Sequence, residues 1–435
     1  MSAIIPQVRV LAAQLGTYVG ETVTLKGWVH KVRHMGNLAF LVLRDRTGLV
    51  QCVLEGEQAG IPIENESVVA VSGKVVTAPK AFGGVEISAV AIEVISAPTM
   101  PLPFEINKKE VKAGLETVLD HRVLSMRNPL IHAVFTIQST LAGGFREHLT
   151  AQGFTQIFTP KIVATGTEGG SNLFPVSYFE QQAYLAQSPQ FYKQMMVGAG
   201  YERVFEIAPV YRAEEHNTSR HLNEYLSLDL EMGFIESEED LMELETGLLR
   251  HMFRKVATEC AAEVALLGIT VPEIAEIPRI PVTEAQAIIE RKYGKLSPKG
   301  DLDPEGERLI CQYVSEGGKP ALVFMTRYPR EIRPMYAMPA PENPGLTASF
   351  DLLFNGLEIT TGGQRIHSPQ MLVESIASRG LDPVSFATYL EVFRLGMPPH
   401  GGMAIGLERL TAKLLGLSNI REATAFPRDR TRLAP

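Results

Sequence analysis

The sequence predicts a multidomain α+β protein, in which a small five-stranded barrel precedes a larger domain built on a mainly antiparallel sheet flanked by helices. Three features of the 435 residues support this prediction. Short β-branched runs fill the first part of the chain, a proline-rich stretch follows them, and helical and extended patterns alternate in the remainder. The length itself favours two or three domains, because compact domains seldom exceed about 250 residues.

The predicted barrel strands are rich in Val, Leu and Ile and are bounded by Gly, Asn and Pro. They span Thr22–Val29, Leu38–Arg44, Leu49–Leu54, Ser67–Gly73 and Val85–Val94. Short strands in this arrangement suit a closed barrel of the oligonucleotide-binding (OB) kind. The proline-rich stretch Ala97–Pro103 ends the region, so we expect a barrel domain over residues 1–104, a hinge over 105–129 and a second domain over 130–435.

The second domain begins with a helical pattern, since apolar residues recur at helical spacing between Leu130 and Leu149. The helix is expected to end near Gly153, and an extended segment should then reach Pro160. Residues 260–340 mix helix and loop patterns, so we expect an insertion there, to which the sequence assigns no chemistry.

Two strand patterns are clear. In residues 226–234 apolar side chains alternate with Ser227, Asp229 and Glu231, and the polar side chains should therefore face a pocket rather than the core. A hairpin is predicted around Asn355-Gly356, because this dipeptide supplies the positive φ angles of a tight turn.

The net charge of −8 argues against nucleic-acid binding by a generally basic surface. One local basic cluster is interleaved with aromatic residues and could hold a nucleic acid, although a solvated strand face is the ordinary interpretation of such a run. Its members are Lys26, Trp28, His30, Lys31, Arg33, His34, Phe40, Arg44 and Arg46.

Cysteine usage and hydropathy indicate the compartment. The three cysteines, Cys52, Cys260 and Cys311, lack the spacing of a metal site, which indicates a reduced, cytoplasmic protein without structural zinc. Neither a run of about 18 apolar residues nor a secretory leader is visible, so we expect a soluble protein that is not exported and has no membrane partner.

Two motifs carry most of the chemical information. Tyr211–Glu214 is followed by Arg220–Tyr225, and a glycine-rich run, Gly396–Arg409, lies near the carboxyl end. An Arg-x-Glu by itself is most often a surface ion pair. Together, however, the two segments place Arg212 and Arg409 beside groups suited to a phosphate ligand. The pair resembles motifs 2 and 3 of the class II aminoacyl-tRNA synthetases, and most closely the aspartyl enzymes of the compact archaeal and eukaryotic type.

The resemblance extends from Trp28 to the carboxyl end and implies ATP-dependent activation of an amino acid, followed by its transfer to the 3′ end of a tRNA. Arg212 would bridge the α-phosphate and the amino-acid carboxylate. Arg409 would meet the γ-phosphate, and Tyr225 would stack on adenine. The implied ATP site comprises Arg212, Glu214, Arg220, His221, Leu222, Tyr225, Glu358, Gly406 and Arg409, with the two arginines as catalytic residues.

The resemblance also implies a magnesium site. Asp351 and Glu358 flank the predicted turn, and Mg²⁺ typically binds one or two carboxylates together with phosphate oxygens. Thr361 stands where the family usually has serine, so the hydroxyl is retained. Without the resemblance, the two carboxylates would be weak evidence for a metal site.

L-Aspartate is the implied amino acid. Lys193 and Arg365 would grip its side-chain carboxylate, because two buried cations favour an anion and would be left unpaired by the amide of asparagine. Either residue alone would more often be a structural ion-pair partner. The implied site comprises Glu168, Gln190, Lys193, Asp229, Thr361 and Arg365.

In the resembling enzymes the barrel binds the anticodon, and Phe40, Gln51 and Glu86 match the positions that hold the central uridine. Phe40 could equally be a core residue. His30 and Phe82 stand where strictly aspartate-specific enzymes have tryptophan and lysine. These two departures predict a nondiscriminating enzyme that charges both tRNA(Asp) and tRNA(Asn), with a partner amidotransferase that amidates the misacylated product.

The helix over 130–149 and the extended segment after it resemble motif 1, the dimer interface of the family, which implies a homodimer. Any amphipathic helix packed on its own sheet would show the same pattern.

Four alternatives stay open from the sequence. A discriminating aspartyl-tRNA synthetase and an asparaginyl-tRNA synthetase share the architecture. An ammonia-dependent asparagine synthetase would need no barrel. A noncatalytic nucleic-acid-binding relative would be expected to lose the phosphate arginines or the metal carboxylates.

Overall fold

A computed structural model describes residues 9–166, 172–216 and 218–434. The chain divides into two compact units, residues 1–129 and 130–435. Within the described ranges, no helix is both long enough and apolar enough to cross a membrane.

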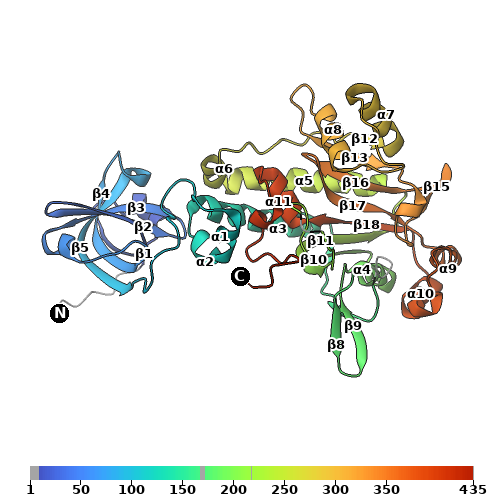
Figure 1. The fold of residues 1–435 in the computed structure, drawn as a ribbon, viewed down its shortest axis with the longest axis horizontal. Helices are drawn as coiled ribbons and strands as arrows, with labels where there is room; N and C mark the ends of the chain where they lie inside the picture. Colours follow the sequence, from blue (N-terminus) through green and yellow to red (C-terminus); the bar gives the residue numbers. More distant parts are fainter. Residues whose placement is uncertain (1–8, 167–171, 217, 435) are drawn as a thin grey trace. The chain divides into compact units, whose positions relative to one another are not determined.

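The first unit contains the predicted barrel, and all five strands are confirmed (Figure 1). They close in the order β1-β2-β3-β5-β4. Inward-facing residues such as Leu25, Leu41 and Ile87 are fully buried in its core, because side chains alternate along each strand. The strands are β1 (Thr22–Met35), β2 (Leu38–Asp45), β3 (Gly48–Glu55), β4 (Val68–Thr77) and β5 (Val85–Ser96).

Short helical turns complete the first unit. Two lie in the predicted hinge, which packs with the barrel in this unit, one precedes β1, and two connect strands. They are η1 (Ala12–Tyr18), η2 (Gly56–Gly60), η3 (Phe82–Gly84), α1 (Leu115–Asp120) and α2 (Arg122–Ser125).

The basic cluster needs one correction, because Arg44 is buried and is not a surface cation. Its guanidinium donates to both carboxylate oxygens of Glu66, at 3.0 and 2.7 Å, and Arg127 donates to the same carboxylate at 3.1 Å. A buried guanidinium needs such compensation. The remaining basic members, Lys26, Lys31, Arg33, His34 and Arg46, are exposed.

The second unit is built on an eight-stranded sheet in the order β12-β13-β16-β17-β18-β11-β10-β6. Most neighbours are antiparallel, as predicted, and only β6 with β10 and β12 with β13 pair in parallel. The strands are β6 (Thr155–Gln156), β10 (Arg203–Tyr211), β11 (Glu224–Gly233), β12 (Arg279–Pro281), β13 (Leu322–Thr326), β16 (Ser349–Phe354), β17 (Leu357–Arg365) and β18 (His400–Gly406).

Residues 260–340, the expected insertion, supply β12 and β13 to one end of this sheet. Two small sheets lie outside it. They contain β7 (Ile162–Val163), β8 (Pro175–Tyr178) and β9 (Gln181–Leu185), and β14 (Pro339–Ala340) and β15 (Asn343–Thr347).

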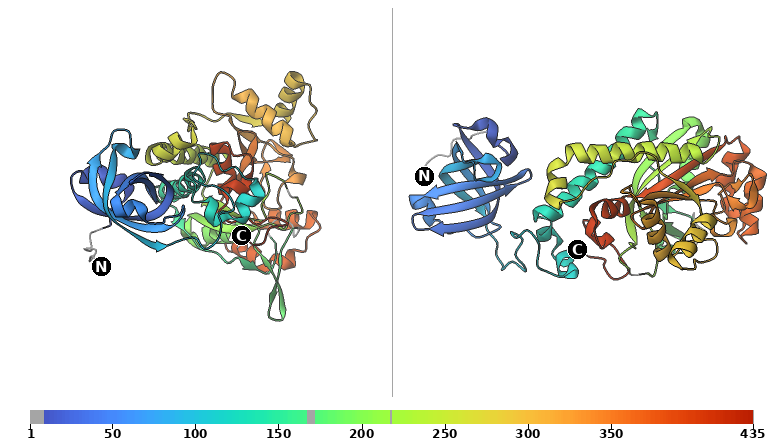
Figure 2. Two further views of the ribbon diagram at one scale, coloured as in Figure 1. Left: turned by 60° about the vertical axis from the view of Figure 1, so that its left-hand side comes forward. Right: turned by 90° about the horizontal axis from the view of Figure 1, so that it is seen from above.

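Long helices cover one face of the sheet (Figures 1 and 2). α3 (Pro129–Ala151), α5 (Glu239–Glu259) and α11 (Leu407–Leu415) pack with the sheet in one apolar core. α3 confirms the helical pattern predicted after Leu130. The other helices are α4 (Gln190–Met196), α6 (Ala261–Leu267), α7 (Val282–Tyr293), α8 (Pro304–Val314), α9 (Pro369–Ser378) and α10 (Ala387–Arg394), with single turns η4 (Val197–Tyr201), η5 (Arg330–Ile332), η6 (Pro383–Phe386) and η7 (Ile420–Ala423).

Strand β11 shows why the two faces differ. Leu228 and Leu230 are fully buried in the apolar core, whereas Asp229 points to the opposite face and lines a cavity. The predicted alternation is therefore confirmed. The tight turn between β16 and β17 is also confirmed, since Asn355 and Gly356 have φ angles of 48° and 75°.

One buried carboxyl on α5 makes the stability of this unit depend on pH. Oε1 of Glu245 accepts a hydrogen bond of 2.5 Å from Thr360 Oγ1 on β17, and the side chain is fully buried. Burial raises the pKa of Glu245 from 4.5 to about 8. Because the folded state keeps a proton that the unfolded state loses, the free energy of unfolding should fall as the pH rises through this interval.

We expect Glu245→Gln, which cannot ionise, to remove this pH dependence. The melting temperature of the variant minus that of the wild type should increase by roughly 2–8 °C between about pH 5 and about pH 8. Glu243→Gln, on the exposed side of the same helix, is the matched control. A difference between Glu245→Gln and the wild type that stays constant with pH would contradict the expected buried, neutral carboxyl.

Candidate active site

A cavity of about 340 Å³ opens on the face of the sheet opposite the long helices. The segments predicted to bind ATP and the amino acid meet there. The predicted site residues that line it are Gln190, Lys193, Arg212, Glu214, Arg220, His221, Leu222, Tyr225, Asp229, Glu358, Thr361, Arg365, Gly406 and Arg409.

The two motif arginines share this cavity although they are far apart in the chain. Arg212 follows β10, and its guanidinium lies 5.8 Å from the ring centroid of Tyr225 on β11. Arg409 belongs to the first turn of α11 and donates a hydrogen bond of 3.0 Å to the carbonyl oxygen of Glu358. The antiparallel pairing of β10 with β11, and of β11 with β18, brings these residues together.

The loop after Arg212 forms another wall of the cavity. Nδ1 of His221 lies 2.7 Å from Thr218 Oγ1, and its Nε2 lies 3.8 Å from a carboxylate oxygen of Glu214. Burial lowers the pKa of His221, which favours the neutral imidazole. Arg220 forms an ion pair with Glu307 of α8.

The predicted metal carboxylates lie on adjacent strands. Asp351 is directly opposite Thr361, and Thr361 Oγ1 donates a hydrogen bond of 3.1 Å to Glu358 Oε1. Burial, together with the nearby charge of Asp351, raises the pKa of Glu358. Oδ2 of Asp351 accepts a hydrogen bond of 2.7 Å from Arg333. Its Oδ1 is buried and has no hydrogen-bond partner among the described residues.

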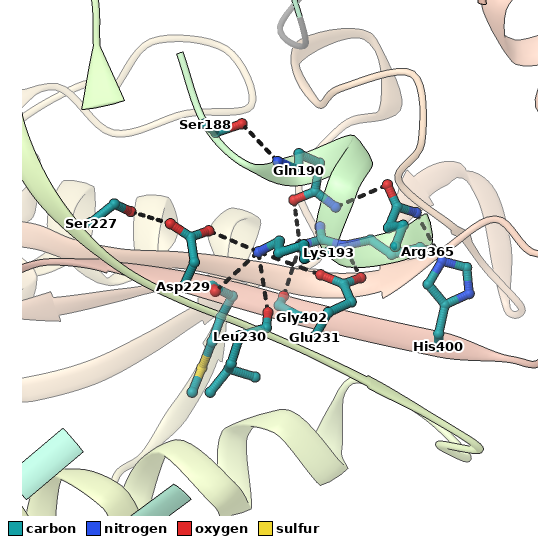
Figure 3. Close-up of polar contacts among 12 residues, drawn as sticks. Ser188, Gln190, Lys193, Ser227, Asp229, Leu230, Glu231, Arg365, His400 and Gly402 are labelled. Carbon is teal, nitrogen blue, oxygen red and sulfur yellow. Dashed lines mark hydrogen bonds and ion pairs between the residues drawn. The ribbon is translucent and has the colours of Figure 1, made fainter. Parts of the chain in front are cut away.

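Lys193 and Arg365 lie side by side in a buried niche (Figure 3). Nζ of Lys193 contacts Asp229 Oδ1 at 2.9 Å and Glu231 Oε2 at 3.4 Å. Nε of Arg365 donates to Glu231 Oε1 at 3.2 Å. Contrary to the expectation of two cations that lack a partner, both are therefore balanced by carboxylates. Gln190, at the start of α4, lies 3.5 Å from Arg365 through its Oε1.

The glycines of β18 permit this close packing. A Cβ at Gly402 would collide with the carboxylate of Glu231 and with the carbonyl oxygen of Leu230. The Gly402 carbonyl in turn accepts a hydrogen bond of 2.9 Å from Arg365 Nη2. The glycine-rich run thus places backbone, instead of a side chain, against the niche.

A buried polar network of Gln194, His400 and Tyr389 lies next to the niche. Gln194 donates to His400 Nε2 at 2.8 Å and accepts from the Tyr389 hydroxyl at 2.8 Å. Burial lowers the pKa of His400 to about 4, so the imidazole is neutral at physiological pH.

Sequence reasoning did not single out four polar residues of this network and of the cavity wall. His400 lies within the glycine-rich run but was given no role, whereas Gln194, Arg333 and Glu307 lack a local motif; contacts with residues elsewhere in the chain mark all four. Glu168, the remaining predicted aspartate-site residue, lies outside the described residues.

The predicted anticodon residues belong to the barrel. Gln51 on β3 donates a hydrogen bond of 2.8 Å to Glu86 on β5, and the two are direct neighbours in register. Phe40 on β2 is only partly buried and takes no part in the barrel core. Phe82, at the start of η3, is 49% exposed. Nδ1 of His30 lies 3.0 Å from the guanidinium of the buried Arg44.

Comparisons with known proteins agree with this geometry. The family model described as tRNA synthetases class II (D, K and N) matches residues 114–430, and the one described as OB-fold nucleic acid binding domain matches residues 23–95. The chain is 53% identical over 436 residues to an aspartate–tRNA(Asp/Asn) ligase of Deinococcus radiodurans, with 99% of both chains covered. It is 52% identical over 429 residues to the ligase of the same name from Thermus thermophilus, with 98% of this chain and 100% of the relative covered.

Solved structures share the architecture. An asparaginyl-tRNA synthetase of Pyrococcus horikoshii, complexed with asparaginyl-adenylate, matches with a TM-score of 0.91 and 32% identity over 99% of this chain and 100% of that one. An aspartyl tRNA synthetase of Entamoeba histolytica matches with a TM-score of 0.87 and 31% identity over 99% and 94%. The resemblance inferred from the motifs is confirmed, and the chain belongs to the class II aminoacyl-tRNA synthetases.

Proposed function

We propose that the protein activates L-aspartate with ATP and transfers it to tRNA(Asp) and tRNA(Asn), as a nondiscriminating aspartate–tRNA ligase of the cytoplasm. The observation that carries the amino-acid choice is the niche in which Lys193 and Arg365 pack around Glu231 and Asp229. Relatives named aspartate–tRNA(Asp/Asn) ligase support the same choice.

Charge complementarity favours aspartate over asparagine. Lys193 and Arg365 present ammonium and guanidinium N–H donors beside each other in the niche. The side-chain carboxylate of L-aspartate can accept charge-assisted hydrogen bonds from both at its two oxygens. The side-chain amide of asparagine has one oxygen acceptor, and its NH₂ group would face donors. Asp229 is the natural acceptor for the ammonium group, and Lys193 and Arg365 are the natural donors to the side-chain carboxylate.

The first step joins aspartate to the nucleotide. The α-carboxylate attacks the α-phosphorus of ATP, a new P–O bond forms, and pyrophosphate leaves. Arg212 is suited to hold both reacting groups, because a planar guanidinium can donate to two oxygens in a fixed geometry. Arg409 and Arg220 line the same cavity and would bind the outer phosphates. The ring of Tyr225 offers a stacking surface for adenine.

The residues proposed for Mg²⁺ fit the ion. Glu358, Asp351 and the hydroxyl of Thr361 are hard oxygen ligands, and the buried Oδ1 of Asp351 lacks a hydrogen-bond partner among the residues described. When bound, the ion would neutralise the negative charge of the phosphates. Arg333 holds the other oxygen of Asp351 and so fixes the orientation of this carboxylate.

In the second step the 3′ hydroxyl of the tRNA attacks the aspartyl carbonyl. The ester bond forms, AMP leaves, and the phosphate of the adenylate takes the hydroxyl proton. The barrel would bind the anticodon through Phe40, Gln51 and Glu86, and His30 and Phe82 would leave the third base unselected. A homodimer formed through the α3 region, and an amidotransferase that corrects aspartyl-tRNA(Asn), belong to the same proposal.

Replacement of a niche cation tests the choice of amino acid. Arg365→Gln should lower kcat/KM for aspartate in ATP–pyrophosphate exchange by roughly 30- to 3,000-fold, because it removes one partner of a buried charge pair. KM for ATP should change by less than about threefold. The exposed Arg394→Gln is the matched control, and thermal melting shows whether each variant folds. Wild-type exchange that is faster with asparagine than with aspartate would favour an asparaginyl enzyme, as in the Pyrococcus horikoshii structure, and contradict the proposal.

Charging of isolated transcripts tests the tRNA range. With labelled aspartate, kcat/KM for tRNA(Asp) and tRNA(Asn) should agree within about tenfold. His30→Trp should reduce charging of tRNA(Asn) more than that of tRNA(Asp), whereas His34→Trp, an exposed position on the same strand, should affect both equally. If the wild type prefers tRNA(Asp) by more than about a hundredfold, the enzyme is discriminating and this part of the proposal is wrong.

A further inference from the structure

Glu307 is a partly buried carboxylate that no motif assigns to the site. It lies in the first turns of α8, within residues 260–340, for which the sequence indicated no chemistry. The start of this helix is fixed, because Asp303 caps it by accepting a hydrogen bond of 2.8 Å from the Gly306 amide. Glu307 therefore projects from a rigid element.

The partner of Glu307 is Arg220, on the loop between β10 and β11. Nη2 of Arg220 donates to Glu307 Oε2, and the two side chains are only 24% and 14% exposed. Arg220 lines the cavity and Glu307 does not. The carboxylate of Glu307 thus binds the guanidinium of Arg220 from outside the cavity lining. The other N–H donors of the guanidinium remain available to a ligand in the cavity.

The surrounding charges make this contact sensitive to protonation. Burial raises the pKa of Glu307 to about 7, with Arg220 as the largest opposing influence. The other charged or titratable groups that act on Glu307, or on which it acts, come from β17, α8 and α11. They are Glu358, Cys311, Arg409 and Lys413.

We propose that Glu307 is a positioning residue for ATP, which holds the guanidinium of Arg220 at the cavity wall so that it can bind the outer phosphates. A long arginine side chain without this carboxylate would lose rotamer freedom only when ATP binds, and this loss would weaken binding. The inference rests on the proposed use of ATP and extends it to a residue outside the motifs. Since the ion pair between Arg220 and Glu307 needs an ionised carboxylate, it should weaken as the pH falls through about 7.

ATP–pyrophosphate exchange with Glu307→Gln tests the inference. At about pH 8, KM for ATP should rise roughly 3- to 10-fold, while kcat and KM for aspartate should stay within about twofold of the wild type. The ratio of the two KM values for ATP, variant over wild type, should fall towards one by about pH 6, because the wild type then loses the same charge. Glu305→Gln, an exposed glutamate on the same helix, is the control and should show neither effect.

Two further measurements keep the outcome decisive. Glu307→Asp, which retains the charge on a shorter arm, should give a smaller rise in KM for ATP and should keep the pH dependence of the wild type. If thermal melting shows that Glu307→Gln does not fold, Glu307→Asp and the pH profile of the wild type serve as the test instead. An unchanged KM for ATP, or a ratio that does not vary with pH, overturns the role of Glu307 alone. Absence of aspartate-dependent exchange in the wild type overturns the proposed function instead.

Discussion

Compensation of buried charge is the constraint on which the catalytic unit depends. A cation taken out of water costs free energy unless a carboxylate or a phosphate replaces its hydration. On the cavity side of the sheet, long side chains from separate elements meet this requirement in pairs. These are Lys193 with Asp229, Arg365 with Glu231, Arg409 with Glu358, Arg333 with Asp351 and Arg220 with Glu307. The charges are thereby oriented before any substrate arrives, which is the condition for electrostatic preorganisation.

The sheet provides the rigid support for this arrangement. Along β11, Leu228 and Leu230 pack into the core with the long helices, and Asp229 and Glu231 project from the same strand into the niche. A strand anchored by its apolar face cannot shift by one residue without burying its carboxylates in the core. The register of β11 is therefore fixed by the core, and with it the positions of the two carboxylates. Gly402, the direct neighbour of Glu231 on β18, leaves room for this carboxylate, because a Cβ there would collide with it.

The segment 260–340 belongs to the working part of the molecule. β13 pairs with β16, so the strand that carries Asp351 is an interior strand of the sheet and not an edge strand. The same segment brings Arg333 onto Asp351 and Glu307 onto Arg220. The partners are 18 and 87 positions apart in the chain, so neither contact leaves a local motif in the segment.

The sequence alone determined the local features: the five barrel strands, the alternation in 226–234, the Asn355-Gly356 turn, the helix after Leu130 and the two motifs that identify the family. Each of these follows from the conformational preference or the spacing of neighbouring residues, which can be read without coordinates. Only the tertiary structure decided which charges pair. It placed Arg44 inside a bidentate pair with Glu66, matched both niche cations with carboxylates, and joined 260–340 to the sheet. Such partners lie far apart in the chain, and the free energy of a buried charge depends on what the fold brings within a few ångströms of it.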